Sequence, residues 1–380
     1  MKLNVGILAI VFSLSSGLCH AQDPGDLLGQ SKAITTAVPF LLITPDARHA
    51  ALGDAGVASS PDANASFWNA GKLVFIDKSF GGTVSYTPWL GKIINDMSVS
   101  YLSGFYKISR EQAVSFSLKY FDLGDITFTN TVGDVTGDFN PREFAFDLTY
   151  SRMLTEHLGV GIAGRYIHSN LTGAFTSGAN DARPGKSAAA DIGIFYTRQL
   201  QNAKSSNLSL GASITNIGAK ISYSDNNNKD FLPTNLRLGG AFTTELDPSN
   251  TLTFLLDVNK LMVPTIDENQ SLLNGMFGSF GDAPGGASEE LKEFMLSVGV
   301  EYWYHDSFAA RLGYFNEAYE KGNRKYLTVG AGFRKNLFGF DIAYLVPTNK
   351  REHPLAETLR FTLSLQMPQK DQDLDRTVTE

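Results

Sequence analysis

The residues of this chain that could carry out chemistry are few and lie far apart in the sequence. The histidines after residue 21 are His49, His157, His168, His305 and His353. They show no metal-ligand spacing such as H-E-x-x-H, and the chain has no G-x-S-x-G nucleophile motif. The stretch 134–138 (DVTGD) has the aspartates of a calcium loop but lacks its closing glutamate. We therefore expect neither an enzyme nor a bound metal or cofactor.

One glycine string, GVGIAG at residues 159–164, matches the G-x-G-x-x-G pattern of dinucleotide sites. That pattern binds a pyrophosphate where a strand turns tightly into a helix. Here the residues RYIH follow, and the glycines fall in the middle of an expected strand. We interpret them as small residues on the inner face of a β-barrel, where they leave room for a segment inside it.

The elements that must position these residues are strands, because apolar and polar residues alternate over most of the chain. The clearest examples are 114–120, 144–150, 294–302 and 359–365. Successive side chains of a strand point to opposite faces, so each segment has one apolar and one polar face. The expected strands are 79–89, 96–106, 112–121, 142–153, 157–168, 189–198, 207–216, 234–245, 250–260, 293–304, 307–315, 325–334, 338–346 and 358–366.

Short and long connectors alternate between these strands. The connectors 107–111, 155–156 and 305–306 are short, whereas 122–141 and 261–292 are long. Bacterial outer-membrane barrels have an even number of strands, short periplasmic turns and long extracellular loops. A β-sandwich has no reason to keep its long loops at one end. The sequence therefore predicts an all-β, fourteen-stranded antiparallel barrel in the outer membrane, with both termini in the periplasm.

The composition agrees with an exported membrane barrel. The 380 residues carry a net charge of -7, which disfavours nucleic acid as a partner. Mean hydropathy is -0.10, as expected when half of each membrane strand is polar. Lys2, the apolar run 5–14 and the sequence CHA at 19–21 predict a secretory signal over residues 1–21. The single cysteine, Cys19, lies in it after Leu18, which does not fit a lipoprotein signal.

The stretch 22–77 lacks the alternating pattern and contains the apolar run VPFLLI at 38–43. We expect it to form a plug or hatch inside the barrel, with a short helix within 47–58. The barrel then spans 78–367, and a polar tail spans 368–380 in the periplasm. Charges of mixed sign on the inner face are expected to hold the plug through salt bridges rather than to conduct ions. They are Lys119, Asp147, Arg165, Arg237, Asp257, Glu301, Arg311 and Arg334.

The longest loop, 261–292, is more apolar than solvation requires. It contains Met276, Phe277 and Phe280, followed by an expected short helix over 288–293. Such a loop either folds over the mouth of the barrel or forms a contact surface for another protein. We treat Met276, Phe277 and Phe280 as candidate partner-binding residues.

The expected plug resembles the N-terminal region of the PorV family, the outer-membrane shuttle components of the type IX secretion system of Bacteroidetes. The similar runs are FLLITPDAR (40–48), GDAGVA (53–58) and FWNAGKL (67–73). The similarity continues through 85–90 and 121–126, and the strand count and loop lengths also fit. The plug residues taken from it are Pro45, Asp46, Arg48, Gly53, Asp54, Gly56, Trp68 and Asn69.

The resemblance implies a non-enzymatic protein that binds secreted cargo by its C-terminal signal domain at a large translocon barrel. It further implies delivery of the cargo to a sortase-like attachment complex, in contact with outer-membrane lipid. PorV proteins in turn resemble FadL fatty acid transporters, whose hatch carries Asn-Pro-Ala. Here the equivalent Asn69, Ala70 and Gly71 lack the proline. A FadL-like transporter of hydrophobic small molecules and a purely structural barrel are the alternatives.

Overall fold

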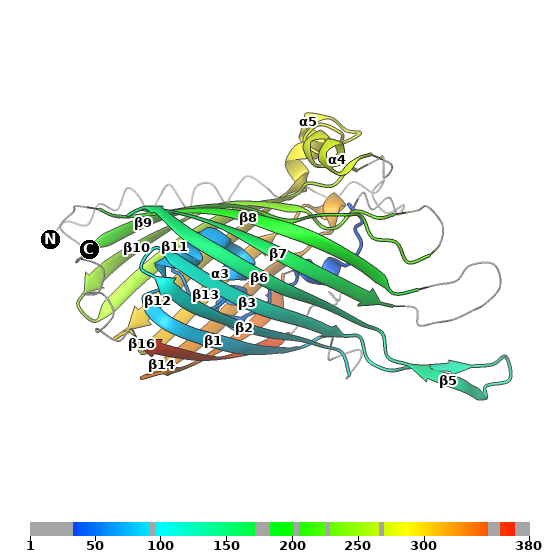
Figure 1. Cartoon of the computed structure of the whole chain (residues 1–380), viewed down its shortest axis with the longest axis horizontal. Coiled ribbons are helices and arrows are strands. Elements are labelled where there is room, and N and C mark those ends of the chain that lie inside the picture. Colours follow the sequence, from blue (N-terminus) through cyan, green and yellow to red (C-terminus); the bar gives the residue numbers. More distant parts are fainter. Residues whose placement is uncertain are drawn as a thin grey trace, which may run out of the picture.

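The computed structural model describes residues 33–90, 96–171, 183–200, 205–224, 229–265, 270–348 and 358–368. The expected signal segment and all but the first residue of the expected tail lie outside these ranges. The dominant feature is one closed antiparallel barrel (Figure 1). Its strands are β1 (Lys78–Pro88), β2 (Ser98–Ser109), β3 (Gln112–Asp122), β6 (Arg142–Thr155), β7 (Leu158–Asn170), β8 (Gly185–Leu200), β9 (Ser206–Gly218), β10 (Asn235–Asp247), β11 (Asn250–Leu261), β12 (Phe294–Tyr304), β13 (Phe308–Asn316), β14 (Lys325–Lys335), β15 (Phe338–Pro347) and β16 (Leu359–Pro368).

These fourteen strands confirm the fold expected from the sequence. The largest difference in bounds is at β8, which starts at Gly185 rather than at residue 189. β1 pairs with β2 on one side and with β16 on the other, so the barrel wall has no free edge. Closure matters in lipid, because every backbone N–H and C=O must find a partner within the protein. The turns after β2, β6, β10, β12 and β14 form one end, here called the short-turn rim, and the opposite end is the long-loop rim.

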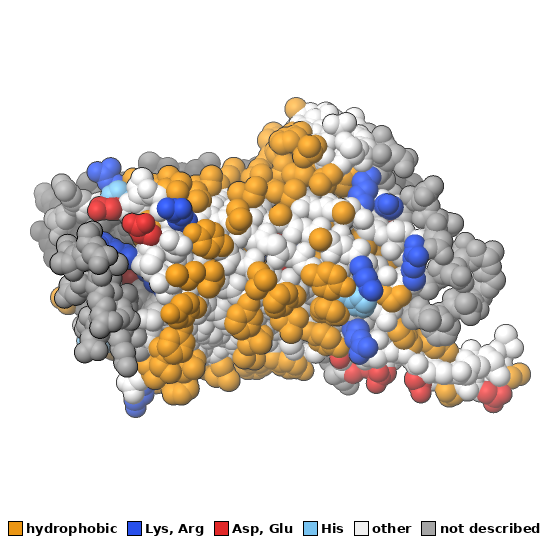
Figure 2. All heavy atoms as spheres, viewed as in Figure 1, with side chains coloured by type: hydrophobic (Ala, Val, Ile, Leu, Met, Phe, Trp, Pro, Cys, Tyr) orange, Lys and Arg blue, Asp and Glu red, His pale blue; other side chains and the backbone are white. Residues whose placement is uncertain are grey.

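The burial pattern of each strand is that of a membrane barrel rather than of a soluble sheet. In β6, Phe146, Leu148 and Tyr150 are exposed on the outer face, whereas Asp147 and Thr149 are buried inside. Lipid on the outside and packed polar groups on the inside account for this inversion. Hydrophobic side chains accordingly cover the middle of the outer wall, and charged side chains lie nearer the two ends (Figure 2).

A hairpin that the alternating pattern did not reveal extends from the long-loop rim. It consists of β4 (Ile126–Thr129) and β5 (Val135–Phe139) and projects beyond the barrel (Figure 1). The calcium-like stretch 134–138 belongs to it, and the Asp134 carboxylate accepts a hydrogen bond from Asn130 Nδ2 at 3.1 Å. Asp134 therefore serves the turn of the hairpin.

The helices are short and fall into two groups. The first group precedes β1 and the second lies in the loops of the long-loop rim. They are η2 (Pro39–Leu42), α2 (Ala47–Ala50), α3 (Ala65–Trp68) and η3 (Ala70–Phe75), and then α4 (Leu272–Gly278), α5 (Ala287–Glu290), η4 (Leu291–Glu293) and η5 (Tyr319–Lys321). The helix expected within 47–58 stops at Ala50, because Gly53 and Asp54 take left-handed φ angles of 67° and 61°. None of the described helices has the length and apolar character needed to cross a membrane.

Candidate functional site

The segment that precedes β1, residues 33–76, lies inside the barrel (blue in Figure 1) and is called the lumen segment below. Leu52, Trp68, Lys72 and Leu73 are among its fully buried side chains. η3 packs against β6, β7 and β8, and α2 packs against β14, β15 and β16. The lumen segment therefore touches opposite sides of the wall and fills the space between them.

Asp46 organises the first half of this segment. It caps α2 by accepting the His49 backbone N–H at 2.9 Å, and the same oxygen lies 2.8 Å from His49 Nδ1. The other carboxylate oxygen accepts a hydrogen bond from Trp68 Nε1 at 3.0 Å. Burial opposes ionisation of Asp46, but the contacts with His49 and Trp68 outweigh it and hold the pKa of this carboxyl below its usual value.

Two further hydrogen bonds extend this chain of polar groups. His49 Nε2 lies 2.8 Å from Ser59 Oγ, which in turn lies 2.7 Å from Lys72 Nζ. Asp46, His49 and Ser59 thus follow the hydrogen-bond order of an Asp–His–Ser triad. All three are buried, and Ser59 Oγ donates to Gly56 O at 3.0 Å. The cluster therefore ties α2 to η3 through buried hydrogen bonds.

Lys72 lies at the end of that chain with its amino group fully enclosed. Its Nζ donates to Gly56 O at 2.6 Å and to Ser59 Oγ at 2.7 Å. Burial lowers the pKa of Lys72 to about 8, although the nearby Asp62 carboxylate opposes the shift. Throughout the described ranges, the side chains of His, Cys, Asp and Glu form no group of three or more that could hold a metal ion.

Arg48 fastens the lumen segment to the barrel wall. Its Nε and one terminal nitrogen donate to the two oxygens of Glu301 on β12, at 2.9 and 2.8 Å. The other terminal nitrogen donates to Asp62 at 2.9 Å. Glu301 also accepts from Arg311 on β13 at 2.7 Å, and Arg311 donates to Asp341 on β15 at 2.7 Å. These buried ion pairs link Arg48 to three strands, as expected for inner charges of mixed sign.

Other expected plug residues bind the wall through single hydrogen bonds from backbone or side-chain groups. The Gly56 N–H donates to Asp257 on β11 at 2.6 Å, and Asp54 accepts from the Tyr326 hydroxyl at 2.5 Å. Asn69 Nδ2 donates to Ile194 O on β8 at 2.9 Å. A Cβ on Gly53 would lie 2.5 Å from the Tyr314 backbone nitrogen, so only glycine fits. Pro45 is buried directly before the Asp46 cap.

Of the other inner charges, Arg334 lies over the Trp303 ring. Asp147, Arg165, Arg237 and Lys119 belong to a second cluster near the aromatic residues of α3. Arg165 pairs with Asp147 at 2.5 Å and with Asp191 at 2.9 Å. The Arg237 side chain donates to Phe67 O at 3.1 Å and lies over the Phe67 ring. Lys119 lies over the other side of this cluster, 4.7 Å from the Phe67 ring centre. Both clusters therefore join the lumen segment to strands far apart in the sequence.

The dinucleotide-like string of β7 supports the lumen segment in a different way. A Cβ placed on Gly159 or Gly161 would overlap the backbone of Gly71 or Ala70, whereas one on Gly164 would meet nothing within 4 Å. The first two glycines thus face inward and let the backbone of η3 approach the wall. This geometry agrees with small residues that make room for an internal segment and leaves no space for a nucleotide.

The long loop between β11 and β12 folds into a compact unit, residues 270–293, which we call the knob. In Figure 1 it stands on the side of the barrel near the long-loop rim. The sequence predicts Met276, Phe277 and Phe280 as exposed contact residues. The structure places Phe277 and Phe280 on the surface, 66% and 44% exposed, but buries Met276. Gly275 faces the Phe231 ring of the neighbouring loop, so this side of α4 is the one that attaches the knob.

A buried ion cluster forms the base of the knob. Lys321, from η5, donates to Glu289 and Glu293 at 2.9 Å each. Lys260, at the end of β11, is paired with Glu293 and lies 3.4 Å from a carboxylate oxygen of Glu290. The end of β11 and η5 thus converge on the two short helices α5 and η4. Because its base is fixed, the knob presents α4 in one orientation rather than as an unstructured loop.

Sequence reasoning missed several residues of these sites. Leu273 and Leu291 are 61% and 72% exposed and share the surface of the knob with Phe277 and Phe280. A helical spacing of four residues between Leu273 and Phe277 could have indicated a common face. No such signal existed for Ser59 or Lys72, because their partners come from other turns of the lumen segment.

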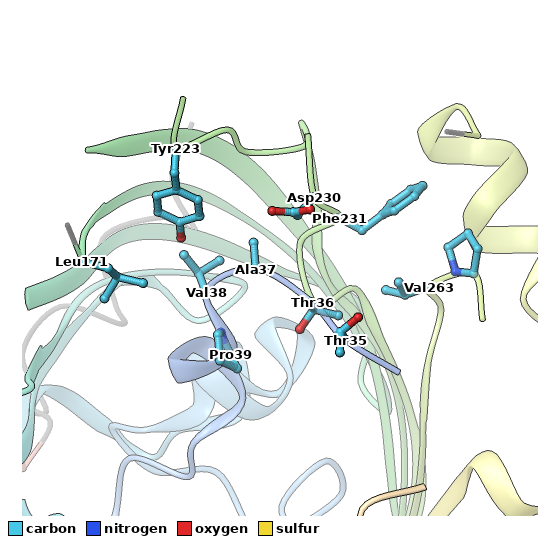
Figure 3. Close-up of a pocket in the computed structure, with 11 residues that line it drawn as sticks. Thr35, Thr36, Ala37, Val38, Pro39, Leu171, Tyr223, Asp230, Phe231 and Val263 are labelled. Carbon is cyan, nitrogen blue, oxygen red and sulfur yellow. The ribbon is translucent and has the colours of Figure 1, made fainter. Parts of the chain in front are cut away.

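A pocket of about 340 Å³ opens where the start of the lumen segment meets the loops of the long-loop rim (Figure 3). Thr36, Val38 and Pro39 line it from the lumen segment, and Tyr223 and Phe231 line it from the loop between β9 and β10. Phe40 and Leu41, the next residues of η2, are buried in an apolar cluster. The pocket is therefore closed on the inner side by packed side chains of the lumen segment.

Comparison with solved structures shows the same fold. The CymD monoaromatic hydrocarbon channel is 13% identical at a TM-score of 0.50, with 85% of this chain and 97% of that chain covered. A TodX monoaromatic hydrocarbon channel mutant (deltaS2S3) is 11% identical at a TM-score of 0.50, with 85% and 99% covered. At such identities the likeness concerns the barrel fold alone.

The sequence itself gives the family. No curated protein matches it. The family model described as "Type IX secretion system protein PorV" matches residues 28–268, which include the lumen segment and strands β1 to β11. With more than half of the chain covered and a closed outer-membrane barrel around the matched segment, the chain belongs to the PorV family and is an outer-membrane component of type IX secretion.

Proposed function

We propose that this PorV-family protein is a non-enzymatic carrier of secreted proteins. In this proposal it binds cargo through the C-terminal signal domain of the cargo at the translocon barrel. It then moves within the outer membrane to a sortase-like attachment complex. The membership of the family supports a role in type IX secretion. The binding and transfer of cargo are the proposed steps.

The proposed orientation places the short-turn rim and both termini in the periplasm. Outer-membrane barrels keep short turns on that side and long loops outside the cell. The hairpin of β4 and β5 and the knob extend from the long-loop rim. In this orientation both would be available to partners at the cell surface, where cargo emerges.

A filled lumen favours a carrier over a channel. The lumen segment is held by buried ion pairs at Arg48 and by close backbone contacts at Gly159 and Gly161. Removing one partner of a buried ion pair typically costs about 3–5 kcal/mol, so a segment held by several such groups opens rarely. We infer that the barrel serves as a rigid platform and that its loops do the binding.

The observation that carries the proposal is the apolar surface of the knob. Leu273, Phe277, Phe280 and Leu291 are exposed on a unit whose base is fixed by the Lys321 ion pairs. Exposed aromatic residues on a rigid support are typical of protein contact sites, because little side-chain entropy is lost on binding. We propose this surface as the contact with the translocon or with cargo.

The test is co-purification from native outer membranes. The variant Phe277→Ser/Phe280→Ser should keep a heat-stable barrel but lose both the secreted proteins and the large translocon barrel. Val132→Ser is the matched control, because Val132 is 80% exposed on the β4–β5 hairpin, away from the knob. If the knob variant still co-purifies with the same partners, or if the control loses them equally, the knob is not the surface that contacts the partners.

A second function is favoured by the pocket at the mouth of the barrel. Its volume of about 340 Å³ lies within the range of small-molecule sites. We propose as the alternative a FadL-like barrel that takes up a hydrophobic small molecule there. Saturable binding of oleate to the purified protein, abolished by Val38→Trp, would support it. Binding that is unaffected by this change would exclude the pocket.

A further inference from the structure

The outer wall contains a hollow that the barrel fold alone does not explain. One row of directly paired residues crosses five strand pairs on the outer face. It runs Phe116, Gly104, Gly82, Leu365, Phe338 and Lys335. Two neighbouring positions of this row, Gly82 and Gly104, have no side chain. A hollow of about 540 Å³ lies there.

The walls of this hollow are apolar. Phe116, Phe338 and Leu365 stand beside the glycines in the same row, and Val84 and Leu363 stand in the next row toward the long-loop rim. The Phe116 ring lies over Gly104, because a Cβ there would come within 2.6 Å of the ring. Gly82 consequently forms the open floor. Such a trough accepts a flexible hydrocarbon chain lying along the wall.

A polar pocket of about 430 Å³ adjoins this hollow at the short-turn rim. The two share Lys335, Phe338, Gly339 and Ser364 in their linings. The charged residues of the polar pocket at the rim are Lys78, Lys335 and Asp306, together with His305. Arg334 also lines it, but its guanidinium lies over the inward Trp303 ring. Lys335 is exposed and ends the row of paired residues, so its amine stands between the apolar hollow and the polar pocket.

An apolar trough joined to a cationic pocket is complementary to a ligand that has a hydrocarbon chain and an anionic head group. Acyl chains occupy the membrane interior, and their phosphates lie at the interface, where Lys and Arg side chains bind them. Val84, Phe338 and Leu363 line the hollow and are exposed on the outer, lipid-facing wall, so lipid reaches it without crossing water. We propose that this composite site binds one glycerophospholipid, with an acyl chain over Gly82 and the phosphate at Lys335. In the orientation proposed above, the lipid belongs to the periplasmic leaflet.

The test is native mass spectrometry of the purified full chain in detergent, titrated with palmitoyl-oleoyl phosphatidylglycerol. The wild-type protein should retain one lipid at low lipid concentration. Lys335→Glu should weaken that binding by roughly tenfold or more, because a phosphate-binding charge is reversed at the membrane interface. Lys186→Glu, on an exposed lysine at the start of β8, is the matched control and should bind as the wild type does.

A second pair of variants tests the apolar half. Gly82→Leu places a side chain in the hollow and should abolish retention of the single lipid. Gly164→Leu adds the same side chain at an outward glycine of β7 with free space around it and should change nothing. A Cβ on Gly82 would lie 2.8 Å from Ser103 O, which could prevent Gly82→Leu from folding. In that case the result for Lys335→Glu tests the proposed lipid site by itself.

Three results would overturn the proposal. One is equal lipid retention by the wild type, Lys335→Glu and Gly82→Leu. Another is equal loss in the controls Lys186→Glu and Gly164→Leu. The third is competition by oleate at the same concentration as phospholipid, since oleate offers the hydrocarbon chain without a phosphate.

Discussion

Replacing Arg48 by Met should release the lumen segment while leaving the barrel intact. Arg48 donates two hydrogen bonds to Glu301 on the wall and one to Asp62 within the segment. Met fills a similar volume but supplies no charge. Glu301 keeps its bond from Arg311 at 2.7 Å, and Asp62 keeps the Asn64 backbone N–H at 2.9 Å. The wall strands lose no backbone hydrogen bond.

The size of the effect follows from what remains buried. Removing one partner of a buried ion pair costs about 3–5 kcal/mol, because the other charge is left without compensation. Here two carboxylates lose a partner, and each retains one donor, so we expect a value within that range. At about 1.4 kcal/mol per tenfold change, amide exchange in residues 46–62 should accelerate by roughly 140- to 3,700-fold. Exchange in the strands should stay slow.

Hydrogen exchange of the detergent-solubilised protein measures residues 46–62 and the barrel strands in one experiment. Liposome swelling reports whether the lumen has opened to small solutes. The double variant Arg48→Met/Glu301→Gln should destabilise the docked lumen segment by less than the sum of the two single changes. It also removes the Glu301 charge that Arg48→Met leaves uncompensated. Arg311 still has Asp341 as a partner in that variant. Unchanged exchange in residues 46–62 of Arg48→Met, with Glu301 still ionised, would refute the reasoning.

Three further predictions concern the lumen segment and the knob. Gly161→Val should displace the lumen segment and raise solute leakage, because its side chain would overlap the η3 backbone, whereas Gly164→Val, on the lipid-facing side, should be tolerated. Burial lowers the pKa of Lys72 to about 8, so between pH 8 and about 10.5 the released segment binds a proton that the docked one does not. Protection of the lumen segment in hydrogen exchange should therefore rise with pH across this window, and Lys72→Met should remove the rise. Lys321→Met removes the cation that Glu289 and Glu293 share, while Glu293 keeps Lys260. It should destabilise the knob by about 3–5 kcal/mol, measured as faster proteolysis within α4 at unchanged barrel stability.

The barrel could be predicted almost completely from the sequence, because its signal is local. Alternation such as Phe146, Asp147, Leu148 and Thr149 places each side chain on a face without reference to any other strand. The hairpin of β4 and β5 was not predicted, since Asp, Gly and Thr there indicate a turn-rich loop as readily as a short strand. The short helix expected within 47–58 is limited to Ala47–Ala50, because the left-handed Gly53 and Asp54 prevent its continuation.

The candidate partner-binding residues show where local sequence patterns stop being informative. The sequence indicates that Met276, Phe277 and Phe280 are apolar residues in a loop, and α4 then turns Met276 inward and Phe277 outward. Which side of a short helix is exposed depends on what it packs against, here the Phe231 ring at Gly275. Sequence spacing alone does not contain that neighbour.

The sequence by itself determined the class of molecule, the number and order of its strands, and the resemblance of residues 40–73 to the PorV family. Only the tertiary structure decided how Arg48 meets Glu301, how His49, Ser59 and Lys72 join, and how Gly82 and Gly104 open a hollow in the wall. The physical reason is the range of the interactions. Side-chain alternation acts between adjacent residues, whereas an ion pair across 253 positions of sequence exists only after the barrel has closed.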